Sequence, residues 1–107
     1  MKNVCVLGGG SWGIAVARLL HENGHHVVIW EFNPKDAETL QQTREHAQKL
    51  PGIRLPDQIA VTTDLGEASQ DAEIICFVIP SHTVRQTAAL LEAQKVAGNI
   101  YRRLQIF

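Results

Sequence analysis

Apolar residues recur along the chain in four short runs, and a longer amphipathic stretch follows each of them. The runs cover residues 3–7, 26–31, 59–62 and 73–79, a length and continuity typical of β-strands. The last run is apolar almost throughout, as expected of a strand whose two faces are both covered by helices. This alternation predicts an α/β fold with a doubly wound parallel sheet of about four to five strands.

The stretches between the runs carry helix start and stop signals. The first helix is expected over residues 11–23 and ends at Gly24. Its predicted buried face consists of Gly13, Val16, Ala17 and Leu20. The second is expected to begin after the N-cap Asn33 and to run to about residue 46.

Two more helices are predicted in the second half of the chain. Asp64 and Glu67 form a capping-box pattern for a short helix. Ser81 is expected to cap the last helix, directly after Pro80 stops the fourth strand. The predicted buried face of that helix consists of Val84, Ala88 and Leu91.

The motif with the clearest chemical meaning connects the first strand to the first helix. Residues 8–13 read G-G-G-S-W-G, which fits G-x-G-x-x-G. At these positions Gly8 permits a tight turn, Gly10 lets backbone approach a pyrophosphate, and Gly13 lets the helix pack closely on the sheet. Free N–H groups and the helix dipole favour phosphate at the start of the helix. We therefore predict a dinucleotide-binding site.

The second strand ends in Glu31, and no arginine follows it. A carboxylate at this position can accept hydrogen bonds from ribose hydroxyls and repels a 2′-phosphate, so NAD is favoured over NADP. The alternative is that the glycines only form a tight turn and that Glu31 is a solvated strand end. A methyltransferase-type nucleotide site requires a different spacing and ranks lower.

The amino-acid composition of the chain limits the classes of binding partner that we expect. The chain has 107 residues, ten Lys and Arg, eleven Asp and Glu, and a formal net charge of −1. It lacks the basic excess that a nucleic-acid backbone or an anionic membrane surface attracts. The early apolar run is too short for a signal peptide or a membrane span. We expect one cytoplasmic domain without nucleic-acid or membrane partners.

Cysteine and histidine spacing indicates no metal or redox site. Cys5 and Cys76 each lie within an apolar run and form no C-x-x-C motif, so we expect two reduced, buried thiols. His21, His25 and His26 are close in sequence, but Gly24 should end the helix before the strand begins. Acidic partners at ligand spacing are missing, and we expect no metal site.

The opening of the chain, V-L-G-G-G-S-W-G over residues 6–13 with Ala15 and Ala17, resembles the NAD(P)-dependent glycerol-3-phosphate dehydrogenases. The Ser-Trp pair is more particular than the glycines. The resemblance covers about residues 3–95, the amino-terminal cofactor-binding part of such an enzyme. Further matches are Asn23-Gly24-His25, Trp30, Thr43-Arg44-Glu45, Leu50-Pro51-Gly52-Ile53, Leu55-Pro56, Thr63-Asp64-Leu65 and Val78-Ile79-Pro80-Ser81.

The resemblance implies a cofactor site and a reaction. It places Phe32 beside the adenosine half of the cofactor, and Pro80 and Ser81 towards the nicotinamide. The pyrophosphate site is implied to comprise Gly8, Gly10, Ser11, Trp12 and Gly13. The family interconverts dihydroxyacetone phosphate and sn-glycerol 3-phosphate by hydride transfer with NAD(H), and so supplies glycerol 3-phosphate for glycerolipid synthesis.

The family continues into a segment with a catalytic lysine and a helical substrate domain, and we expect this chain to lack both. We therefore assign no catalytic residue and expect the chain alone to bind NAD without turnover; the phosphate-bearing substrate would bind only to the full-length enzyme. Residues 101–107 are an atypical tail, because Arg102 and Arg103 fall where a buried strand is expected. We expect the coding frame or the gene to be interrupted near Tyr101.

Two other functions fit the same pattern. One is the NAD-binding module of another dehydrogenase, such as one that acts on a hydroxy acid. The other is a non-enzymatic nucleotide-sensing or interaction domain. A homo-oligomer is compatible with the sheet edge beyond the fourth strand, which we expect to be unpaired.

Overall fold

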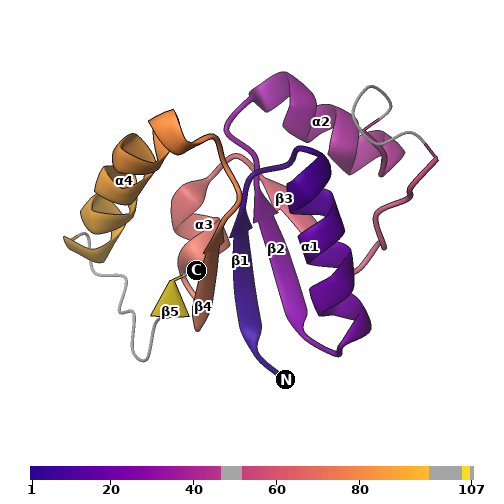
Figure 1. The fold of residues 1–107 in the computed structure, drawn as a ribbon, viewed down its shortest axis with the longest axis horizontal. Coiled ribbons are helices and arrows are strands. Elements are labelled where there is room, and N and C mark those ends of the chain that lie inside the picture. Colours follow the sequence, from indigo (N-terminus) through magenta and orange to yellow (C-terminus); the bar gives the residue numbers. More distant parts are fainter. Residues whose placement is uncertain (47–51, 97–104, 107) are drawn as a thin grey trace.

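A parallel β-sheet is the middle layer of the molecule, in a computed structural model that describes residues 1–46, 52–96 and 105–106 (Figure 1). The strand order is β3-β2-β1-β4-β5. From β1 the chain moves outward through β2 and β3, and it then returns to β4 on the other side of β1. This reversal confirms the doubly wound sheet. The strands are β1 (Asn3–Leu7), β2 (His26–Trp30), β3 (Ala60–Thr62), β4 (Ile74–Phe77) and β5 (Gln105–Ile106).

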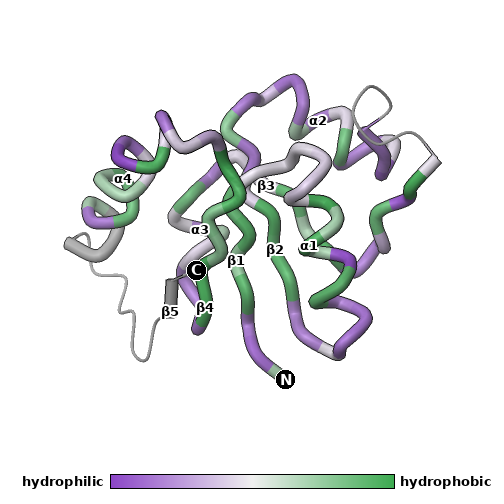
Figure 2. Tube along the Cα trace, viewed as in Figure 1, coloured by the Kyte–Doolittle hydropathy of each residue, from purple (hydrophilic) through white to green (hydrophobic). Residues whose placement is uncertain are grey.

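Helices cover both faces of the sheet. They are α1 (Ser11–Glu22), α2 (Pro34–Thr43), α3 (Leu65–Ser69) and α4 (Val84–Val96), with a 3-10 turn, η1 (Ser81–Thr83), before α4. Val4 and Val6 of β1 pack towards α1 and α2, whereas Cys5 and Leu7 pack towards α3 and α4. Figure 2 shows the apolar strands at the centre and polar positions on the outer helices. A strand with two apolar faces requires this layering.

Two of the three predicted helix caps form. Asn33 Oδ1 accepts the N–H groups of Lys35 and Asp36 at 2.9 and 3.3 Å. Asp64 Oδ1 accepts the N–H of Glu67 at 3.1 Å. The prediction that Ser81 caps the last helix is wrong, because no side-chain cap bond forms at the start of η1.

The buried face of α4 also differs from the prediction. Val84 is 36% exposed and Ala88 is exposed, whereas Thr87 and Leu91 are buried. The helix α4 begins at Val84, after the 3-10 turn η1, and not directly after Ser81 as predicted. On α1, Gly13 and Ala17 are buried as predicted; Val16 and Leu20 are partly buried, and the buried Ile14 was not predicted.

Arg44 is the C-cap of α2, which ends three residues earlier than expected. Its side chain binds the segment that leads to β3. Its φ is 61°, in the left-handed region. The guanidinium donates to the carbonyls of Leu55 at 3.4 Å, Pro56 at 2.6 Å, and Ile59. The pKa of the Arg44 side chain is lowered, because the effect of burial is larger than the opposing effect of the Asp57 carboxylate at 3.9 Å. The side chain is only 13% exposed, so it is a structural anchor.

The two cysteines are free and face opposite sides of the sheet. Cys5 packs with α3 and α4, and Cys76 packs against the core under α1 and α2. Burial raises the pKa of the Cys5 thiol to about 12, with a smaller contribution from Cys76. Burial also raises the pKa of Cys76, which is half-buried. Both thiols are therefore protonated at neutral pH.

The outer edge of β4 is not bare. Ile74 and Ile75 pair in parallel with Gln105 and Ile106 of β5, so the prediction of an unpaired edge is wrong at these positions. Tyr101 and the following arginine pair, where we expected the interruption, lie outside the described residues.

Glu73, which directly precedes β4, should make the free energy of unfolding depend on pH. Its Oε1 accepts the Asn3 N–H at 3.3 Å, and its Oε2 lies 3.5 Å from Lys2 Nζ. These contacts, the hydrogen bond foremost, lower the pKa of Glu73 in the folded chain. The stabilisation is present above the unfolded pKa and is lost as pH falls through the folded value.

We expect the difference in urea midpoint between the wild-type chain and Glu73→Gln to be largest at neutral pH and to shrink as the solution is acidified to about pH 3. Urea unfolding monitored by circular dichroism at several pH values measures this difference. A gap that stays constant over that range would contradict the role of Glu73.

Candidate functional site

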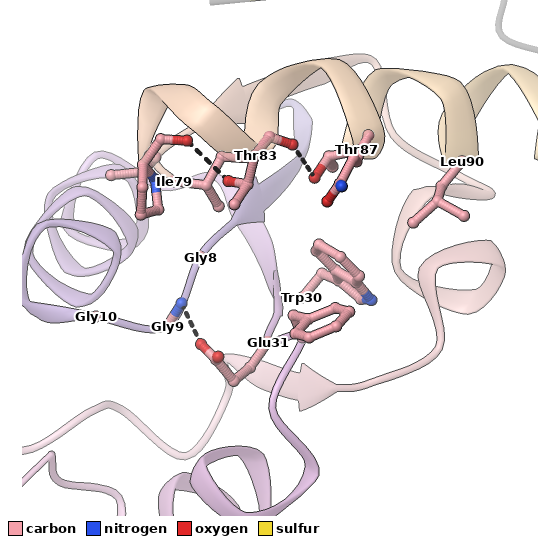
Figure 3. Close-up of a pocket in the computed structure, with 13 residues that line it drawn as sticks. Gly8, Gly9, Gly10, Trp30, Glu31, Ile79, Thr83, Thr87 and Leu90 are labelled. Carbon is pink, nitrogen blue, oxygen red and sulfur yellow. Dashed lines mark hydrogen bonds between the residues drawn. The ribbon is translucent and has the colours of Figure 1, made fainter.

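A pocket of about 300 Å³ opens at the carboxyl ends of β1, β2 and β4 (Figure 3). This is the point at which the strand order reverses, where doubly wound sheets bind their ligands. Residues 8–10 of the glycine loop line it from β1, residues 30–32 from β2, and residues 78–80 from β4. Side chains of η1 and α4 form the remaining wall.

Gly8 is fixed by contacts to the strands on both sides of β1. Its φ of 128° is one that residues with side chains rarely adopt. Its N–H donates to the carbonyl of Trp30 at 2.8 Å. A Cβ at this position would overlap the carbonyl oxygen of Val78. Only glycine satisfies the backbone conformation and the close packing together.

Gly13 allows α1 to lie directly against the turn. A Cβ there would overlap the carbonyl oxygen of Gly8, and backbone atoms cannot rotate away as a side chain can. Gly10 is the N-cap of the helix and its carbonyl accepts the N–H of Ile14 at 2.9 Å. The first turn of α1 therefore follows directly after Gly10, which lines the pocket.

The start of α1 has the character of an anion site. The first N–H groups of any α-helix have no partner within the helix, and the dipole makes this end positive. In α1 these groups belong to Ser11, Trp12 and Gly13, and the first turn carries no acidic side chain. Trp12 is 75% exposed and Ser11 is half-buried. A phosphate group could therefore reach the backbone here.

The carboxylate of Glu31 is bonded at both oxygens. Oε2 accepts the N–H of Gly9 at 2.7 Å, and Oε1 accepts the N–H of Asn33 at 3.2 Å. Glu31 thus lines the pocket at the end of β2, as predicted, and also holds the glycine loop, which sequence reasoning did not anticipate.

Two aromatic rings form the wall on the β2 side. Trp30 is almost completely buried, and its Nε1 donates to the carbonyl of Thr63 at 2.9 Å. Phe32 is 75% exposed, and its ring meets that of Trp30 edge to face, with centroids 6.1 Å apart. An exposed aromatic ring on a rigid aromatic base provides a flat apolar surface.

The wall contributed by η1 and α4 was missed by sequence reasoning. It comprises Thr83, Gln86, Thr87 and Leu90, which recur at the spacing of one helix face. The hydroxyl of Thr83 donates to the backbone carbonyl of Pro80 at 2.8 Å, and the hydroxyl of Thr87 donates to the backbone carbonyl of Thr83 at 3.0 Å. The spacing is visible in the sequence, but the sequence does not show which of two neighbouring helix faces meets the pocket.

The structure brings together five of the nine predicted site residues. Gly8, Gly10, Glu31, Phe32 and Pro80 line the pocket. Ser11, Trp12 and Gly13 form the first turn of α1, immediately after the lining glycines. Ser81 is exposed at the start of η1 and does not line the pocket.

Residues 1–46, 52–96 and 105–106 contain no cluster of three or more His, Cys, Asp or Glu residues arranged to hold a metal ion. Nor does any helix described there have the length and apolarity needed to cross a membrane.

Comparison with known proteins decides the family. The sequence pattern of the family described as the NAD-dependent glycerol-3-phosphate dehydrogenase N-terminus matches residues 3–101. The chain belongs to this family. Over 92 residues it is 44% identical to a glycerol-3-phosphate dehydrogenase [NAD(P)+] of Fusobacterium nucleatum, a match that covers 86% of this chain and 28% of that protein. The resemblance stated from the sequence is therefore confirmed, and it favours this family over a hydroxy-acid dehydrogenase.

Solved structures of the family share the fold. The glycerol-3-phosphate dehydrogenase of Coxiella burnetii superposes with a TM-score of 0.86 at 23% identity, over 98% of this chain and 31% of that one. The enzyme of Saccharomyces cerevisiae gives a TM-score of 0.80 at 25% identity, over 98% of this chain and 32% of that one. The present chain thus spans somewhat less than a third of these relatives.

Proposed function

We propose that this chain is the NAD(H)-binding part of an oxidoreductase that interconverts dihydroxyacetone phosphate and sn-glycerol 3-phosphate. The observation that carries the proposal is the glycine-lined pocket at the reversal of strand order, with the start of α1 beside it. Gly8 and Gly13 support the proposal by allowing a tight turn that brings the start of α1 close to the pocket, since a Cβ at either position would overlap neighbouring backbone. A bound nicotinamide would supply the hydride.

The residues around the pocket suggest how the dinucleotide would be held. N–H groups in the first turn of α1, with Gly10, would bind the pyrophosphate. Phe32 would pack beside the adenosine half, and Glu31 would accept ribose hydroxyls with its remaining lone pairs. Pro80 and Ser81 would lie towards the nicotinamide. The negative charge of Glu31 would disfavour a 2′-phosphate, which supports NAD over NADP.

Turnover needs groups that the pocket does not provide. Reduction of a ketone requires an acid to supply the hydroxyl proton, and a phosphate substrate requires cationic anchors. Among the described residues, none of those that line the pocket is a lysine, arginine or histidine. We propose that these groups belong to the remainder of a full-length, cytoplasmic enzyme and that this chain alone binds the cofactor without turnover.

Titration of the purified chain with NADH and, separately, NADPH tests the proposal. Trp12 is exposed in the first turn of α1, so bound nicotinamide should quench tryptophan emission and accept energy from it. We expect saturable binding of both, with NADH about tenfold tighter because a 2′-phosphate meets the carboxylate of Glu31. Absence of saturable binding to a folded chain would overturn the cofactor proposal.

Two variants isolate the contribution of Glu31 to this preference. Glu31→Gln removes the charge in the pocket, whereas Asp71→Asn removes an exposed charge before β4, at the opposite end of the sheet. Glu31→Gln should bring the affinities for NADH and NADPH to within about threefold of each other, and Asp71→Asn should leave their ratio unchanged. An equal effect of both variants would show that net charge, and not Glu31, sets the preference.

A further inference from the structure

Gly9, the middle residue of the three consecutive glycines, lies against the side chain of Glu31. The bond from its N–H to Oε2 is 2.7 Å long, in the range of charge-assisted hydrogen bonds (Figure 3). Gly9 is buried, Glu31 is half-buried, and the carboxylate reaches the loop from the end of β2. The contact joins residues 22 positions apart.

The backbone does not require glycine at this position. The glycines with positive φ in the described residues are Gly8, Gly24 and Gly52, and Gly9 is not one of them. The constraint is the position of the Glu31 carboxylate: a Cβ at Gly9 would overlap its Oε2 and lie 3.2 Å from its Cδ, so a side chain fits only if the end of the Glu31 side chain moves away. The other close neighbour, Leu40 Cδ1 at 3.0 Å, is a methyl group that can shift by a few tenths of an ångström.

We infer that Gly9 and Glu31 are a matched pair in which the glycine admits the carboxylate and the carboxylate positions the glycine loop. Glu31 extends the connection to α2, because its Oε1 accepts the N–H of Asn33 and the Asn33 side chain caps that helix. The bond occupies the Gly9 N–H, which leaves the first turn of α1 to bind phosphate. Glu31 is therefore a positioning residue as well as a selector against 2′-phosphate.

The length of the side chain at position 31 distinguishes a positioning role from an effect of negative charge alone. Aspartate at position 31 would keep the carboxylate but withdraw it by one methylene, away from the N–H of Gly9. It would also clear the space that a Cβ at Gly9 needs. Glu31→Asp should consequently harm the wild-type loop but rescue Gly9→Ala, a coupling that independent residues do not show.

A double-mutant cycle of the 107-residue chain tests the pair, with thermal unfolding and NADH affinity as separate measurements. Gly9→Ala should lower the unfolding midpoint by about 5 °C and weaken NADH binding about tenfold. Adding Glu31→Asp should bring both values to within about 2 °C and threefold of Glu31→Asp alone. Strictly additive changes would overturn the pairing. If Gly9→Ala does not fold, restored folding of the double variant supports the pair, and failure of both overturns it.

Glu31→Gln supplies the matched control, because glutamine keeps the length of the side chain. It should not rescue Gly9→Ala, and an equal rescue by glutamine and aspartate would contradict a steric match. The effect on affinity rests on the proposed NAD site, whereas coupling in the unfolding midpoint does not. Coupled midpoints without NADH binding would thus refute the proposed function and leave the pair standing.

Discussion

Replacing Gly13 by alanine is expected to weaken NADH binding by more than tenfold and to destabilise the chain by about 2 kcal/mol. Alanine favours a helix over glycine by about 1 kcal/mol, so helix propensity alone predicts stabilisation. The new methyl group would overlap the Gly8 carbonyl. This steric cost should exceed the gain in helix propensity, because neither the methyl group nor the carbonyl can move without a shift of the backbone. α1 must then move away from β1, and its first N–H groups move with it.

Gly24→Ala is the matched control, since it makes the same chemical change after the other end of α1. A Cβ there would meet nothing within 4 Å, although the φ of 88° makes alanine strained. We expect a loss of about 1 kcal/mol and no change in NADH affinity. Urea unfolding and fluorescence titration measure the two quantities. Unchanged NADH affinity in Gly13→Ala would contradict the packing assigned to Gly13.

The largest effect on stability is expected from Arg44→Ala, at about 3 kcal/mol. The substitution leaves the carbonyls of Leu55, Pro56 and Ile59 without the guanidinium, at about 1 kcal/mol each. The left-handed φ of 61° that ends α2 costs alanine about as much as it costs arginine, so it adds little to this loss. Because Arg44 lies outside the pocket lining, NADH affinity of the folded fraction should change little.

Two further substitutions separate the causes at Arg44. Arg44→Gly relieves the backbone strain and should be about 1 kcal/mol more stable than Arg44→Ala. Arg44→Lys keeps the charge but cannot place planar donors on three carbonyls, so we expect it to recover less than half of the loss. Urea midpoints of the four chains decide the order. A lysine variant as stable as the wild type would show that charge suffices.

Those features that depend on local sequence were predictable. Strands β1 and β2 lie where the apolar runs predicted them, and the glycine motif lies between β1 and α1 as its mechanism requires. The identity of Asn33 as a cap was also predictable, because the cap acts within the next three residues. In each case the determining contacts join neighbours in sequence or follow a fixed period.

The parts that were missed depend on contacts between distant segments. Which face of α4 lines the pocket depends on how the helix packs against the rest of the chain, and this packing buries Thr87 instead of Ala88. The bond between Gly9 and Glu31 requires the loop and the end of β2 to meet in space. Neither propensity nor periodicity contains that information.

The reversal of strand order also constrains how the molecule assembles. The pocket is lined by the turn after β1 and by residues 78–80, so it does not exist until β4 has paired with β1. That pairing joins segments about 70 residues apart and closes a long loop in the chain. A ligand that binds across this junction favours the closed pairing by mass action, by about 2.7 kcal/mol at a hundred times its Kd. Cofactor concentration would thereby set the fraction of chains that are fully folded.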